Sequence, residues 1–157
     1  MIRRAQPRDV PAVEQLLADA NLPALKTSPV QLFVAEEKGT LQGAVGLEPY
    51  PPYALLRSLV VTPNQRGKGL GRALLMNALK GARAQGFDTV YGLTTTISGW
   101  LERLGFQRVE RSAIPEPVHA SDELGDACPE SALAYERNLN PRYARGVREG
   151  GFKSGKL

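Results

Sequence analysis

The feature that most constrains the fold of this chain is a short loop rich in glycine and positive charge, residues 66–71 (Arg-Gly-Lys-Gly-Leu-Gly). The apolar run before it, residues 55–61, indicates a buried strand that ends before Pro63. After the loop, apolar residues recur at helical spacing from Leu70 to Ala82, which predicts an amphipathic helix. A glycine-rich loop at the start of a helix points successive backbone N–H groups at one spot, where the helix dipole also favours negative charge. The sequence therefore predicts a phosphate-binding site here, and we call residues 66–71 the anion loop.

The spacing of the glycines excludes two common nucleotide sites. A nucleotide P-loop ends in Gly-Lys-Ser or Gly-Lys-Thr, whereas here Gly71 is followed by Arg72 and Ala73. The dinucleotide fingerprint needs G-x-G-x-x-G after the first strand of a βαβ unit, and the glycines of the anion loop are spaced differently. What remains is Arg66-x-x-Gly69-x-Gly71, for which a plain helix-capping turn is the alternative interpretation.

Length and composition indicate one soluble domain. The chain has 157 residues, of which 42% are hydrophobic and 23% charged, enough to bury a core. No apolar run approaches the ~20 residues of a membrane span, and the N-terminus lacks the apolar core of a signal peptide, so we expect a cytoplasmic protein with no membrane partner. The single cysteine, Cys128, excludes an internal disulfide and a multi-cysteine metal site. We expect Cys128 to be a buried free thiol and the protein to hold no metal.

The positive charge lies in the last residues of the chain. The formal net charge of +4 equals the excess of Arg and Lys in residues 140–157, so the remaining body is neutral. The neutral body argues against a nucleic-acid partner. Because this basic tail shows no apolar periodicity, we expect it to be disordered and the domain to span residues 1–139.

Periodicity along the chain predicts a mixed α/β fold with the element order βαβββαβαββ. Asp9 is expected to cap the first helix with its side chain, residues 48–53 (Glu-Pro-Tyr-Pro-Pro-Tyr) to break the sheet, and Gly86 to end the helix after the anion loop. The expected strands are residues 2–5, 31–37, 41–47, 55–61, 88–94, 106–111 and 131–139, and the expected helices are 9–20, 70–85 and 98–104, with a helical turn at 122–127.

The element order, the Arg66-x-x-Gly69-x-Gly71 pattern and residues 100–106 (Trp-Leu-Glu-Arg-Leu-Gly-Phe) together resemble the GNAT superfamily of N-acetyltransferases over nearly residues 1–139. The resemblance implies a central, mostly antiparallel mixed sheet flanked by helices, in which the strands ending near Val61 and Thr94 splay apart. It also implies that acetyl-CoA is the co-substrate.

In such a fold, the anion loop would grip the CoA pyrophosphate and the gap between the splayed strands would take the pantetheine arm. A backbone N–H near Val61 would stabilise the negative charge that builds on the thioester oxygen, and holding both reactants in register would lower the barrier further. The co-substrate-binding residues implied are Leu59, Val60, Val61, Arg66, Gly67, Lys68, Gly69, Leu70, Gly71, Arg72 and Thr95.

Four shorter strings, residues 56–61, 93–96, 102–106 and 128–132, resemble the arsenic-resistance N-acetyltransferases in order along the chain. This closer resemblance implies a small amine acceptor, such as an arsenic- or phosphinate-containing amino acid. Fold and co-substrate do not by themselves fix the acceptor.

Leu101 departs from the pattern of the superfamily. Most members have a tyrosine here, whose hydroxyl protonates the departing CoA thiolate. One of the hydroxyls of Thr94, Thr95, Thr96 and Ser98 fills this role, or water does, because a thiolate with a pKa of about 8.5 is a tolerable leaving group at neutral pH.

The candidate acceptor-site residues are polar groups around the strand before the anion loop. Glu48 is expected beside Arg57 and Ser58, where it would bind an ammonium group or relay its proton through water; the alternative is a solvated carboxylate before Pro49. A charge inside an apolar strand is costly unless paired, so Arg57 suits an acidic group of the acceptor or an ion pair with Glu48. The assignments are Glu48, Ser58 and Val61 as catalytic, and Glu48, Arg57, Ser58 and Thr94 as acceptor-binding.

His119, the only histidine, lies in an irregular stretch, residues 115–121, and is either a base or a solvated side chain. Two classes of function remain for a monomer or homodimer of this chain. The first is an acetyl-CoA-dependent N-acetyltransferase acting on a small-molecule amine, with an amino acid or a protein amine as alternatives. The second is a non-catalytic acyl-CoA sensor, suggested by Leu101. The convergent polar groups favour the enzyme.

Overall fold

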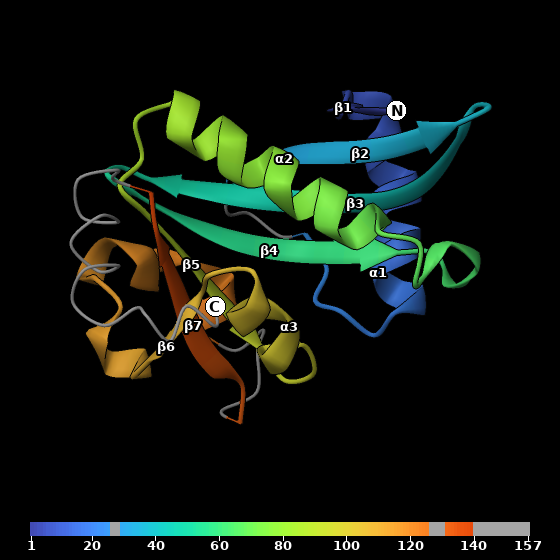
Figure 1. The fold of residues 1–157 in the computed structure, drawn as a ribbon. Helices are drawn as coiled ribbons and strands as arrows, with labels where there is room; N and C mark the ends of the chain where they lie inside the picture. Colours follow the sequence, from blue (N-terminus) through green and yellow to red (C-terminus); the bar gives the residue numbers. More distant parts are fainter. Residues whose placement is uncertain (26–28, 126–130, 140–157) are drawn as a thin grey trace.

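The computed structural model describes residues 1–25, 29–125 and 131–139, so the predictions for Cys128 and for the tail lie outside the described residues. Its seven strands form one sheet in the order β1-β2-β3-β4-β5-β7-β6 (Figure 1). Every pairing is antiparallel except that of β4 with β5. The mixed α/β fold is therefore confirmed. The strands are β1 (Ile2–Arg4), β2 (Gln31–Glu37), β3 (Thr40–Tyr50), β4 (Tyr53–Val61), β5 (Thr89–Thr94), β6 (Gln107–Val109) and β7 (Leu133–Asn138), and the helices are α1 (Val10–Asp19), α2 (Leu70–Ala84) and α3 (Ser98–Arg103).

The two long helices cover opposite faces of the sheet. Leu74 and Leu75 of α2 lie in the main core with Phe33, while Val13 and Leu17 of α1 pack against the other face. Successive residues of a strand point to opposite faces, so β2, which lies between the two helices in Figure 1, contributes side chains to both cores. The helical periodicity around the anion loop is thus explained by the apolar stripe that α2 buries.

The middle strands separate at a bulge in β4. β4 and β5 pair only from Tyr53–Thr89 to Leu56–Gly92. Just beyond, Ala44 pairs with Val60 and Gly46 with Arg57, so two residues of β4 oppose the single Val45. One of the two, Ser58, has a φ of 58°, and such a bulge bends its strand. The splayed middle strands implied by the superfamily are therefore present.

The prediction that residues 48–53 break the sheet is wrong. β3 continues to Tyr50, which pairs with Tyr53, so only Pro51 and Pro52 form the turn. Within the described residues, β3 no longer pairs with β2 beyond Leu47, so the strand has a free edge at Pro49. Pro49 is tolerated there because the N–H that a proline lacks falls at this edge. The consequence for function is that Glu48 lies inside the sheet.

The other predicted elements differ at their ends. The strand expected over residues 106–111 covers only Gln107–Val109, because a 3-10 turn, η3 (Arg111–Ala113), follows it. The turn expected at 122–127 is η5 (Asp122–Leu124), with residues 126 and 127 outside the described part. Helix and strand ends elsewhere fall within one to three residues of the expectation, and Gly86, with a φ of 86°, follows the end of α2 as expected.

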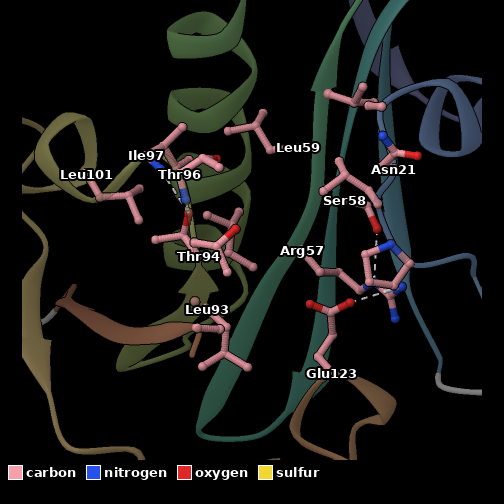
Figure 2. Close-up of a pocket in the computed structure, with 18 of the residues that line it drawn as sticks. Asn21, Arg57, Ser58, Leu59, Leu93, Thr94, Thr96, Ile97, Leu101 and Glu123 are labelled. Carbon is pink, nitrogen blue, oxygen red and sulfur yellow. Dashed lines mark hydrogen bonds and ion pairs between the residues drawn. The ribbon is translucent and has the colours of Figure 1, made fainter. Parts of the chain in front are cut away.

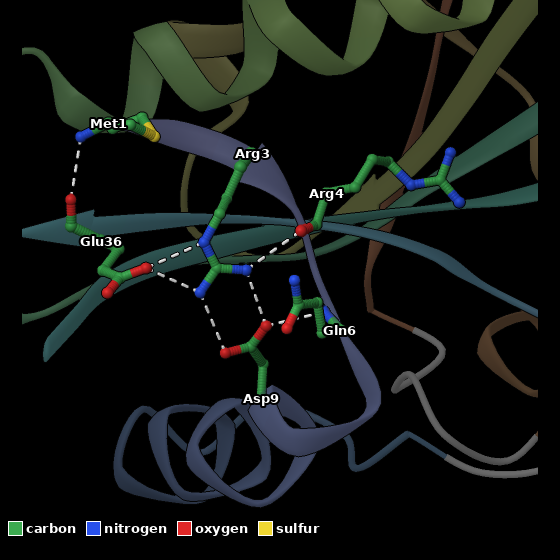
Figure 3. Close-up of polar contacts among 6 residues, drawn as sticks. All are labelled: Met1, Arg3, Arg4, Gln6, Asp9 and Glu36. Atoms are coloured by element: carbon green, nitrogen blue, oxygen red, sulfur yellow. Dashed lines mark hydrogen bonds and ion pairs between the residues drawn. The ribbon is translucent and has the colours of Figure 1, made fainter. Parts of the chain in front are cut away.

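Asp9 occupies the N-cap position of α1 but makes no side-chain cap bond there, contrary to the prediction. Its carboxylate instead accepts hydrogen bonds from Arg3, at 2.8 and 3.1 Å, and from the Gln6 backbone N–H at 2.7 Å. Arg3 also donates to Glu36 at 2.8 Å. A two-pronged bond from a guanidinium is stronger than a neutral cap, and it holds the pKa of Asp9 at about 2. This Arg3 cluster (Arg3, Asp9 and Glu36) ties β1 to β2 and to the start of α1 (Figure 3).

Candidate active site

A cavity of about 630 Å³ opens where β4 and β5 separate. Leu56 to Val61 of β4 form one wall, and Gly92 to Ile97 of β5 and the following turn form another. Residues 20–23 after α1 and Glu123 close its sides (Figure 2). Arg66 of the anion loop lines the same space, so the loop and the interior between the strands are continuous.

The anion loop has the geometry of an anion cradle. Gly67 and Gly69 have φ values of 80° and 86°, which glycine adopts without strain, and Gly69 is the N-cap of α2. The first helical bond runs from Ala73 N–H to Gly69 O at 3.1 Å. Among the described residues, the backbone N–H groups of residues 67–72 have no hydrogen-bond partner. These groups and the exposed cations of the loop fit a pyrophosphate.

The inner edge of β4 is open beside this loop. Beyond Leu56, that edge has no partner strand in the part of the chain that the structure describes. Leu59, Val60 and Val61 line the cavity there. An unpaired strand edge can hydrogen-bond an extended ligand as a neighbouring strand would. The arrangement fits the arm and thioester of an acyl-CoA.

Two carboxylates flank one buried arginine on the cavity wall, and we call Glu48, Arg57 and Glu123 the Arg57 cluster. Arg57 Nη1 donates to Glu48 Oε2 at 2.6 Å, and Nη2 lies 3.4 Å from Glu123 Oε2. Arg57 also donates to Ser58 Oγ at 2.9 Å and to the Ala24 carbonyl at 3.0 Å. The side chains of the cluster are 1% (Arg57), 0% (Glu48) and 7% (Glu123) exposed. Its geometry is fixed by hydrogen bonds from several elements.

The cluster decides between the alternatives for Glu48 and Arg57. Glu48 is fully buried and also accepts a hydrogen bond from the Tyr50 hydroxyl at 2.5 Å, so the solvated carboxylate is wrong. The alternative ion pair between Arg57 and Glu48 is confirmed. Arg57 and Ser58 line the cavity, whereas Glu48 is absent from the residues described on its wall. The structure thus places Glu48 behind Arg57, where it positions the guanidinium.

Glu123 is a site residue that sequence reasoning missed. It lies in η5, where its backbone N–H donates to Ser121 Oγ at 3.1 Å. It reaches the cavity from a stretch of 3-10 turns that has no apolar periodicity, so no local pattern marks it. The one available signal is Arg57 itself, because a buried guanidinium requires carboxylates around it.

The hydroxyls considered in place of the missing tyrosine lie at different depths. Thr94 is buried, and its Oγ1 accepts N–H bonds from Thr96 and Ile97, both at 3.1 Å. Because both lone pairs of this hydroxyl are occupied, it can act only as a hydrogen-bond donor in the cavity. Thr95 and Thr96 line the cavity and are exposed, while Ser98 is not among the described lining residues. Leu101, 2% exposed, forms part of the apolar wall.

His119 lies apart from the cavity. It is exposed, and its Nε2 lies 2.9 Å from the Ile114 carbonyl oxygen, to which it donates. It is not among the described lining residues. The position agrees with the solvated alternative.

The splayed strands and the loop between β4 and α2 are typical of α/β folds that bind acyl-CoA. Comparison with known sequences identifies the family. The model of the acetyltransferase (GNAT) family matches residues 2–106, and the chain belongs to this family. No helix within the described residues has the length and apolar character needed to cross a membrane.

Two relatives illustrate the similarity in sequence. The chain is 33% identical over 87 residues to an uncharacterized N-acetyltransferase of Chlorobaculum tepidum, covering 55% of this chain and 56% of that protein. It is 28% identical over 130 residues to an amino-acid acetyltransferase of Mycobacterium tuberculosis, covering 75% and 74%. The chain thus spans little more than half of the first of these relatives.

Solved structures share the fold. One is N-acetylglutamate synthase from Neisseria gonorrhoeae in complex with coenzyme A and N-acetyl-glutamate, with a TM-score of 0.75, 21% identity, and coverage of 89% of this chain and 35% of that one. Another is a Mycobacterium tuberculosis protein solved with CoA, with a TM-score of 0.72, 21% identity, and coverage of 89% and 99%.

Proposed function

We propose that this protein is an enzyme that transfers the acetyl group of acetyl-CoA directly to a primary amine of a small molecule. The observation that carries the proposal is the continuity of one cavity from Arg66, beside the unpaired N–H groups of the anion loop, to the buried charges of the Arg57 cluster. A site for a phosphate-bearing donor and a polar site for an acceptor thus share one cavity. Family membership supports the same activity.

The open edge of β4 supplies the electrostatic part of the chemistry. When the amine nitrogen attacks the thioester carbon, negative charge builds on the carbonyl oxygen. A backbone N–H at Leu59 or Val61, fixed by the strand, stabilises that oxygen. Binding donor and acceptor in one cavity holds the reacting atoms in register.

For the acceptor, we propose an amino acid or an amino-acid analogue. The mycobacterial relative named amino-acid acetyltransferase supports this class. The strings at residues 56–61, 93–96, 102–106 and 128–132 support its arsenic- or phosphinate-containing members as the finer choice.

The proposal is tested by measuring release of the CoA thiol over a panel of amines at neutral pH. The panel contains amino acids, their phosphinate and arsenic analogues, and simple amines without an acidic group. Steady acetyl-CoA-dependent turnover of at least one small amine, with the acetylated product identified by mass spectrometry, is the expected result. Tight binding of acetyl-CoA without turnover of any amine would favour the sensor.

The role of the anion loop is tested by a matched pair of glycine variants. Gly69 and Gly86 stand just before and just after α2, both with a φ of 86° and with open space where a Cβ would lie. Gly69→Val and Gly86→Val therefore impose similar backbone strain. We expect only Gly69→Val to weaken acetyl-CoA binding, by about 10-fold or more, since loss of two charge-assisted hydrogen bonds is worth at least that. Equal affinities in calorimetry would remove the loop from the binding site.

A further inference from the structure

Resting on the proposed function, we propose that Glu123 is the catalytic residue that binds the ammonium group of the acceptor and takes up its proton before acetyl transfer. The sequence assigned that role to Glu48, which lies behind Arg57 in the structure.

Among the described residues of the cavity wall, Glu123 is the one carboxylate. The other polar side chains on that wall are the hydroxyls of Ser58 and of the threonines at 94–96, the amide of Asn21, and the guanidinium groups of Arg57 and Arg66. An amide, an aliphatic hydroxyl and a guanidinium do not accept a proton at neutral pH. Glu123 is therefore the group on this wall that can act as a base.

Glu123 is also aimed at the space between the strands. Figure 2 shows its carboxylate beside Arg57 and pointing into the gap that separates Arg57 and Ser58 from Leu93 and Thr94. Its side chain is 7% exposed, so an ammonium group that meets it there is largely shielded from water. Attraction between opposite charges is much stronger in such surroundings than in bulk solvent.

Arg57 lies farther from Glu123 than from Glu48. The distance from Arg57 Nη2 to Glu123 Oε2 is 3.4 Å, against 2.6 Å from Nη1 to Glu48 Oε2. Glu48, Ser58 and the Ala24 carbonyl fix the guanidinium from the other sides. Arg57 and Glu48 are thus positioning residues that orient the Glu123 carboxylate in the cavity.

The ammonium group gives one proton to Glu123, and the neutral amine forms a C–N bond with the thioester carbon. The C–S bond breaks, and the second proton on nitrogen goes to the departing sulfur, which gives CoA thiol and the amide. The proton on Glu123 then passes to solvent, so one proton is released for each acetyl group transferred.

The experiment compares the natural protein with Glu123→Gln, Glu123→Asp and Glu116→Gln. Glu116 is an exposed carboxylate on the turn before η5 and serves as the matched control. With an amine turned over in the panel, we expect Glu123→Gln to lose at least about 100-fold in kcat/KM for the amine at pH 7, the lower range for a general base. Acetyl-CoA affinity and the melting temperature stay close to those of the natural protein, and Glu116→Gln behaves normally.

The pH profile separates a base from a purely structural residue. In Glu123→Gln, no carboxylate takes the proton from a bound ammonium group, so only amine that is already neutral in solution reacts. The value of kcat/KM should therefore rise tenfold per pH unit up to the pKa of the amine. Glu123→Asp keeps a carboxylate, so it should retain part of the rate and the pH profile of the natural protein. If Glu123→Gln does not fold, Glu123→Asp takes its place in the comparison. A loss of less than threefold in Glu123→Gln, or an unchanged pH profile, would overturn the assignment while leaving the acetyltransferase intact. Failure of the natural protein to acetylate any amine would overturn both.

Discussion

Two clusters in this molecule share one composition, an arginine between two carboxylates, and differ in where they lie. In the Arg3 cluster, the side chains of Arg3 and Glu36 are 21% and 31% exposed. In the Arg57 cluster no side chain is more than 7% exposed, and Arg57 and Glu123 face a cavity. Solvent therefore screens the first cluster and is mostly excluded from the second.

Burial beside the cavity, rather than the types of residue, distinguishes the Arg57 cluster from the Arg3 cluster. The Arg3 cluster joins β1, β2 and the start of α1, and within the described part of the chain its side chains hydrogen-bond one another and the backbone. In the Arg57 cluster one carboxylate, Glu48, likewise holds the arginine in place, from the side away from the cavity. The other carboxylate, Glu123, is presented to the space where two substrates would meet.

The largest expected difference between the two clusters is in their contribution to stability. Arg57→Met removes the cation from the fully buried Glu48, and an unpaired buried charge should lower the free energy of unfolding by about 3–5 kcal/mol. Arg3→Met, the matched change, should cost less, because Glu36 is 31% exposed and Asp9, at 9%, keeps its hydrogen bond from the Gln6 N–H. Urea denaturation of both variants measures the difference. Equal losses would mean that burial does not distinguish the clusters.

A smaller effect is expected from the carboxylates one at a time. Glu48 accepts from Tyr50 through Oε1 and from Arg57 through Oε2, whereas the amide of Glu48→Gln offers one oxygen and no charge. The free energy of unfolding should therefore fall by about 2 kcal/mol. Glu123→Gln should change stability less, since its contact with Arg57 is longer, at 3.4 Å. Thermal melting of the two variants checks this order. A reversed order would assign Glu123 an anchoring role instead.

The smallest effect is the acid response of the Arg3 cluster. Hydrogen bonds from Arg3, and then from the Gln6 N–H, lower the pKa of Asp9 from its ordinary 3.8 to about 2. A lowered pKa means that the stabilisation is present above pH 3.8 and is lost as the pH falls toward 2. Asp9→Asn should therefore flatten the stability profile in this window and leave the neutral pH rate unchanged. If the stability of Asp9→Asn depended on pH in the same way as that of the natural protein, Asp9 would not be the group responsible.

Local patterns in the sequence predicted the parts of the molecule that are built from neighbours in the chain. The anion loop, the start of α2 and the order of the elements follow from glycine spacing and apolar periodicity. The hairpin at Pro51 and Pro52 was missed, because prolines usually mark a break and only the pairing of β3 shows that Pro49 lies at an edge.

The acceptor side of the site was predicted only in part. Arg57 inside an apolar strand indicated a buried partner, and Glu48 was found because the two strands were expected to be neighbours. Glu123 comes from a distant turn without periodicity, and its approach to Arg57 depends on how the chain between β6 and β7 places η5 beside β4. No spacing within the sequence encodes that approach.

The most direct test of the account is to follow the side-chain carboxyl signals of glutamate by carbon NMR while an amine that the enzyme acetylates is titrated into the protein saturated with CoA. Glu123→Gln and Glu36→Gln assign the two signals that matter. We expect the Glu123 signal to shift and to saturate with the amine, while the Glu36 signal of the Arg3 cluster stays in place. A Glu123 signal that does not move at amine concentrations that saturate turnover would contradict it.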